Sequence, residues 1–139
     1  MRAISSVPPG RRIVSWILKG VVIVILVQTL FFKFSGAPES IYIFSTIGQE
    51  PWGRYGSGVI EAVASVLLLL PRGVIFGALL AVATMTGAIA FHLTRLGIVV
   101  HDDGGLLFVL AWIVLICAGL LVWVHRRDLP FLKSPSASL

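Results

Sequence analysis

The sequence predicts an all-α, polytopic membrane protein, a four-transmembrane-helix bundle with a short interfacial helix between helices 1 and 2. Hydrophobic residues make up 58% of the 139 residues and charged residues only 12%, about half the charged share of a soluble domain. Four apolar segments approach the roughly 20 residues that cross a bilayer. The basic residues lie at the ends of these segments and not in one patch, which argues against a nucleic-acid interface.

The four apolar segments run over residues 13–32, 55–71, 73–93 and 104–124. The first is longer than the core of a signal peptide, which spans about 7–15 residues, so we expect it to remain as a helix. The second is only just long enough to span. The connection between the second and third segments is short enough only for a tight turn, at Pro71, Arg72 and Gly73. We therefore expect the second and third helices to form an antiparallel hairpin.

The connection from Lys33 to Arg54 is long enough to hold a further element. Pro38 followed by Glu39 is typical of a helix start, and an apolar cluster follows at Tyr42, Ile43, Phe44 and Ile47. We expect a short helix on the outer membrane surface. A plain loop carrying a few hydrophobic residues is the alternative.

The distribution of basic residues predicts that both termini face the cytoplasm. Of the 11 Lys and Arg residues, only Lys33, Arg54 and Arg95 then fall outside, as the positive-inside rule requires. The predicted domains are a cytoplasmic N-terminal segment (1–12), a transmembrane domain (13–124) and a cytoplasmic, disordered tail (125–139). The predicted localisation is the cell membrane, as a multi-pass protein.

One acidic residue, Glu61, interrupts the second apolar segment. It shares a helical face with three small residues at i, i+3, i+4, i+7 spacing, namely Gly58, Ala62 and Ser65. Small residues favour close helix contacts in membranes, so we expect Glu61 to point into the bundle. An intramembrane carboxylate costs about 2.5–3.5 kcal/mol on insertion scales and is a functional hypothesis by default.

Further polar residues are expected to approach Glu61 in the outer half of the bundle. Arg54 lies seven residues earlier, close to two helical turns, and therefore on nearly the same face. Lys33 ends the first helix on that side, Gln28 lies just over a turn deeper, and His92 lies near the outer end of the third helix. A cation from Arg54 or Lys33 would keep Glu61 ionised.

This cluster supports two interpretations that the residues alone leave open. In a functional site, Glu61 and His92 are the candidate catalytic residues for proton handling, and the candidate binding residues are Lys33, Arg54, Gln28 and Met85. In a structural cluster, Glu61 fixes the helix packing through an ion pair, His92 is a polar cap at the interface, and Met85 is a packing residue.

Other chemistries have less support in the sequence. The single cysteine, Cys117, provides neither an intramolecular disulfide nor a dithiol pair. His101 with Asp102 and Asp103 fits a solvated loop better than a metal site, and no metal is predicted. The sequence shows no flavin, iron–sulfur or haem motif, so electron transfer would need a partner or a diffusible cofactor such as a quinone.

The order of several short motifs resembles that of the DoxX-like membrane proteins, which have four helices. The resemblance covers residues 31–124. The motifs are FFKFSG at 31–36, Ile47-Gly48, Arg54, Gly58 and Glu61 before LLLLP at 67–71, and Met85, Gly87-Ala88 and His92.

The resemblance implies a membrane subunit of an oxidoreductase complex, because the family takes its name from a subunit of a thiosulfate:quinone oxidoreductase. It places Lys33, Arg54, Glu61 and His92 at polar positions that recur in the family pattern. The expected ligand is a quinone or a small sulfur-containing substrate, and the expected partners are the lipid bilayer and either a soluble redox protein or a second copy of the chain. The alternative is a non-catalytic scaffold or receptor, so whether the protein is an enzyme stays open.

Overall fold

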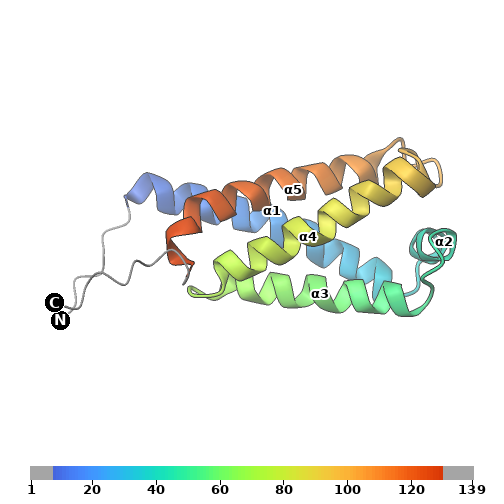
Figure 1. The fold of residues 1–139 in the computed structure, drawn as a ribbon, viewed down its shortest axis with the longest axis horizontal. Helices are drawn as coiled ribbons and strands as arrows, with labels where there is room; N and C mark the ends of the chain where they lie inside the picture. The colour runs from blue at the N-terminus through green and yellow to red at the C-terminus, as the bar shows by residue number, and fades with distance from the viewer. Residues whose placement is uncertain (1–7, 130–139) are drawn as a thin grey trace.

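The computed structural model describes residues 8–129, which form a bundle of four long helices. These helices run side by side along the longest axis of the molecule (Figure 1): α1 (Pro9–Phe34), α3 (Trp52–Leu69), α4 (Val74–Phe91) and α5 (Leu106–His125). Each contacts two neighbours, since α1 and α4 both pack against α3 and α5. Residues 8–129 contain no strand, so the all-α prediction is confirmed.

Three short elements complete this part of the chain: α2 (Pro38–Thr46), the π-helical turn η1 (His92–Leu96) and the 3-10 turn η2 (Arg126–Asp128). α2 begins at Pro38 with Glu39 in its first turn, as the sequence predicts, because proline fits the first helical position and an acid suits the positive end of the helix dipole. α2 lies across one end of the bundle (Figure 1), which we call the α2 end. The opposite end, with the α3–α4 turn around Arg72, is the Arg72 end.

The helix boundaries differ from the predicted segments at both edges of the bundle. α1 begins at Pro9 and not at Ile13, because a proline stands at its first position, where its missing N–H costs nothing. The chain continues past α5 into η2, so the expected tail is structured over residues 126–128. The rest of that tail, residues 130–139, and residues 1–7 lie outside the described part of the chain.

Within residues 8–129, three helices are long and apolar enough, by length and composition, to cross a membrane. They are α1, α4 extended to Leu96, and α5 extended to Asp128. α3 has 18 residues and so extends about 27 Å, close to the roughly 30 Å of a bilayer core. It falls outside this group because its first half carries Arg54, Ser57 and Glu61. These three apolar helices indicate a membrane protein.

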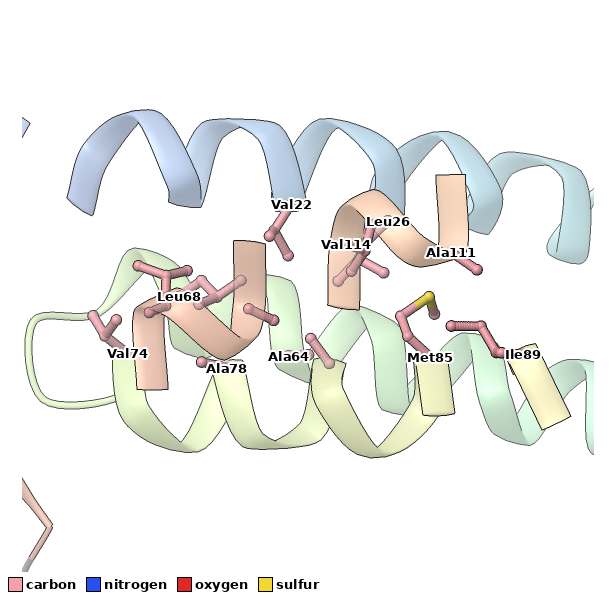
Figure 2. Packing of buried hydrophobic residues seen from close by; sticks show 13 residues of the cluster. Val22, Leu26, Ala64, Leu68, Val74, Ala78, Met85, Ile89, Ala111 and Val114 are labelled. Atoms are coloured by element: carbon pink, nitrogen blue, oxygen red, sulfur yellow. The ribbon is translucent and has the colours of Figure 1, made fainter. Parts of the chain in front are cut away.

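A core of apolar side chains fills the space between the four helices. Figure 2 shows Val22 and Leu26 of α1 pointing toward side chains of α3, α4 and α5, among them Ala64, Met85 and Val114. The hairpin of α3 and α4 is tight, because a Cβ atom at Gly77 would lie only 2.7 Å from the carbonyl oxygen of Ala64. Large apolar side chains also cover the outer surface, as expected of helices that face lipid.

Candidate functional site

A cavity of about 500 Å³ lies between the helices in the half of the bundle at the α2 end. Side chains of all five α-helices line it, and most of them are apolar. Among the residues predicted for the site, five line this cavity: Gln28, Lys33, Glu61, Met85 and His92. Arg54 is not among the lining residues.

Glu61 is the most deeply buried charged residue of this cavity, with 3% of its surface exposed. Lys33 Nζ lies 2.5 Å from Glu61 Oε1, and the hydroxyl of Thr29 donates a hydrogen bond of 3.0 Å to Oε2. Thr29 and Lys33 are four residues apart and so share one face of α1. Of the two cations considered for Glu61, the structure therefore selects Lys33.

The ammonium of Lys33 keeps donors that face the cavity. A lysine carries three N–H donors, and within residues 8–129 it makes one hydrogen bond, to Glu61. Its Nζ also lies 5.8 Å from the ring centre of Phe44 in α2. Lys33 is thus neutralised by Glu61, and two N–H groups remain for a ligand.

Arg54 lies outside the cavity and binds other groups. Its guanidinium donates to both carboxylate oxygens of Glu50 at 2.7–3.0 Å, and its Nη1 donates to the main-chain carbonyl of Lys33. That carbonyl belongs to the last turn of α1, whose carbonyls have no partner within the helix. Arg54 therefore contacts the end of α1 at Lys33 and does not reach the cavity. Glu50 is not among the residues predicted for the site, although its spacing of four residues from Arg54 indicates such a pair.

His92 lines the cavity, and one of its two ring nitrogens has a hydrogen-bond partner within residues 8–129. Its Nδ1 lies 2.8 Å from the carbonyl oxygen of Gly97, and because a carbonyl only accepts, Nδ1 must carry a proton. Nε2 has no hydrogen-bond partner within residues 8–129 and is not among the polar atoms sealed from solvent. His92 is buried and packs edge-on against Phe108 of α5.

Gln28 and Met85 occupy different depths of the same cavity. Gln28 is exposed on α1, and none of its side-chain atoms is hydrogen-bonded within the described residues. Met85 is buried and belongs to the apolar core, while its side chain also lines the cavity. Met85 therefore packs in the core, and a ligand in the cavity would also contact its side chain.

Asp103, which the sequence predicts to lie in a solvated loop, is among the residues that line the cavity. Its carboxylate accepts three backbone N–H groups, from Val100 at 2.9 Å, Gly105 at 2.8 Å and Leu107 at 3.0 Å. Burial alone would raise the pKa of Asp103, but these hydrogen bonds and the charge of His92 outweigh it, and the pKa falls below its ordinary value. The signal in the sequence is an aspartate shortly before a helix start, since aspartate side chains often bind nearby main-chain N–H groups in turns.

We expect replacement of Asp103 with asparagine to remove a pH-dependent part of the stability. A carboxylate with a lowered pKa stabilises the folded state above its unfolded value of 3.8, and this contribution is lost as the pH falls through the lower folded value. The melting temperature of the wild type should therefore fall more steeply than that of the variant in acid. If the melting temperatures of the wild type and the variant fall equally from neutral pH to below 3.8, this role of Asp103 is contradicted.

No protein-family model, curated protein or solved structure matches this chain. The resemblance to DoxX-like proteins therefore remains an expectation carried by the order of short motifs. What the protein does has to be inferred from the cavity and from the groups that line it.

Proposed function

We propose that this protein is a DoxX-like membrane subunit of an oxidoreductase complex and that its cavity binds the head group of a quinone or a similar small redox substrate. One observation supports this most strongly. Lys33, Glu61 and His92 come from three different helices and line one cavity of about 500 Å³ that is otherwise mainly apolar. Small-molecule sites commonly measure about 300–1,000 Å³ and combine apolar walls with a few polar groups.

The proposal includes a placement in the cell membrane. α1, α3, α4 and α5 would all cross the bilayer, with both termini in the cytoplasm and α2 on the outer surface. Support comes from the contacts of α3 with α1 and α4, which put its polar half inside the bundle and away from lipid. The excess of basic residues at the Arg72 end supports this orientation.

The lining groups match the chemistry of a quinone. A quinone offers two carbonyl oxygens that accept hydrogen bonds, and Lys33 retains N–H donors for one of them. Reduction of a quinone by two electrons also consumes two protons, and Glu61 and His92 are groups that can hold and pass protons. The electrons would come from a partner protein, for which this chain would be the membrane subunit.

A second candidate function is a non-catalytic scaffold or receptor. The polar contacts of Thr29, Lys33 and Glu61 connect α1 to α3, and Arg54 binds the end of α1 from outside the cavity. Such a network can hold helices in register without any chemistry. In that case, substitutions in it would change stability or partner recovery and leave every redox rate unchanged.

Binding of a soluble quinone analogue to the purified protein tests the first proposal. We expect replacement of His92 with phenylalanine to weaken binding about tenfold, because a hydrogen bond in a buried site contributes about 1 kcal/mol or more. Glu61→Gln should lower quinone-linked turnover and shift its pH profile. Thr86→Val is the control variant. Thr86 belongs to α4, which contributes residues to the cavity wall, but its own side chain is exposed and does not line the cavity.

Two results would contradict the quinone proposal. The first is that the His92→Phe and Thr86→Val variants bind the quinone analogue with the same dissociation constant. The second is a turnover that survives Glu61→Gln unchanged at every pH. Loss of a copurifying partner in Glu61→Gln, without any change in quinone binding, would favour the scaffold.

A further inference from the structure

A recess of about 270 Å³ lies at the Arg72 end, far from the cavity described above. Residues of α1 and of the α5–η2 region line it: Arg11, Trp123, Val124, Arg126 and Arg127. Three of these five are arginines. Because the recess is formed by both the beginning of α1 and the end of α5, its geometry depends on the packing of these two helices.

Two of the three guanidinium groups are held in place by the protein. Arg11 donates a hydrogen bond to the main-chain carbonyl of Val124, in the last turn of α5. The guanidinium carbon of Arg126 lies 4.8 Å from the ring centre of Trp123, which is the geometry of a cation–π contact. These contacts order the side chains before any ligand arrives, which lowers the entropy lost on binding.

Among residues 8–129, no acidic side chain lines this recess. Asp128 is the one acid near this end, and its carboxylate lies 3.1 Å from His125 Nδ1. The other ring nitrogen of His125 lies 2.8 Å from the hydroxyl oxygen of Ser15 in α1, so Asp128 contacts His125, which does not line the recess.

An apolar stripe on α5 leads toward the recess. Leu120, Trp123 and Val124 share one face of the helix by their i, i+3, i+4 spacing, and Leu120 and Trp123 are 46% and 63% exposed. In the membrane placement proposed above, this face contacts acyl chains, and Trp123 lies at the level of the headgroups, where tryptophan is enriched. A ligand for the recess would thus combine an anion with an apolar tail.

We propose that this recess binds the phosphodiester of an anionic phospholipid, with one acyl chain lying along Leu120 and Trp123. Guanidinium groups suit this ligand because their paired N–H groups match phosphate oxygens. Basic recesses on the cytoplasmic side of membrane helices recognise such head groups. The inference rests on the membrane placement and is independent of quinone binding.

Lipid binding to the purified full chain in mild detergent tests this site by native mass spectrometry. We expect phosphatidylglycerol to bind and phosphatidylcholine to bind at least tenfold more weakly. Arg11→Gln and Arg126→Gln should each weaken phosphatidylglycerol binding about tenfold or more, as expected for lost hydrogen bonds to a charged group. Arg12→Gln is the matched control, because it removes the same charge from the neighbouring residue, which does not line the recess.

Three results would overturn the proposal. An equal loss in Arg12→Gln would show that diffuse surface charge attracts the lipid. If inorganic phosphate displaces the lipid with an affinity equal to that of phosphatidylglycerol, the ligand of the recess is a free anion. Equal binding of the two lipids would show that the recess does not select anions. If Arg11→Gln or Arg126→Gln fails to fold, Arg127→Gln replaces it, since the side chain of Arg127 makes no hydrogen bond within residues 8–129.

Discussion

Replacing Lys33 with methionine is expected to destabilise the protein by about 3–5 kcal/mol, the usual cost of removing one partner of a buried ion pair. Lys33 lies 2.5 Å from Glu61, and their side chains are 13% and 3% exposed. Without the ammonium, the carboxylate of Glu61 would be buried without a positively charged partner, which is unfavourable in an apolar site. Reversible unfolding in mixed micelles, followed by circular dichroism, measures the change.

Lys19→Met is the matched control on the same helix. Lys19 is also buried, and its ammonium lies 4.4 Å from the ring of Trp16, but no carboxylate pairs with it within residues 8–129. Its replacement should therefore cost much less than that of Lys33. The double variant Lys33→Met with Glu61→Gln should recover part of the loss, because it removes both charges. Equal costs for the two lysines, or no recovery, would contradict a coupled pair.

Replacing Gly77 with alanine is expected to destabilise the α3–α4 hairpin by about 1–3 kcal/mol, the typical cost of overpacking. The added Cβ would lie 2.7 Å from the carbonyl oxygen of Ala64 and 3.0 Å from the main-chain nitrogen of Leu68. Both are backbone atoms, which cannot move aside unless the helices separate. The same unfolding measurement gives the value.

Gly87→Ala provides the comparison on the same helix. A Cβ at Gly87 meets no atom within 4 Å, so only the higher helix propensity of alanine acts, and the variant should be neutral or slightly more stable. If the Gly77→Ala variant were as stable as the Gly87→Ala variant, that result would contradict the close approach of α3 and α4 at Gly77.

The sequence predicted the helices and the position of Glu61 well, because both follow from short-range patterns. The apolar runs identify the helices, and a tight turn at Pro71, Arg72 and Gly73 forces α3 and α4 into contact. The spacing of small residues around Glu61 correctly predicts that its carboxylate is buried in the bundle. Periodicity along one helix is sufficient for each of these inferences.

The partners of the charged groups could not be predicted in the same way. Helical spacing places Arg54 above Glu61, but it does not show that Glu50 and the carbonyl of Lys33 bind the guanidinium instead. Asp103 was missed for a related reason, since its carboxylate binds main-chain N–H groups of its own loop. These contacts depend on the conformation of the connections, which the apolar pattern does not specify.

Photoaffinity labelling with a quinone that carries a small photoreactive group tests most directly whether the cavity is a ligand site. We predict saturable labelling of lining residues such as Gln28, Thr84 and Met85, with loss of the label when unlabelled quinone is added or His92 is replaced by phenylalanine. Labelling that unlabelled quinone does not displace, or that spreads over exposed surface residues such as Val24 and Trp112, would contradict a quinone site in the cavity.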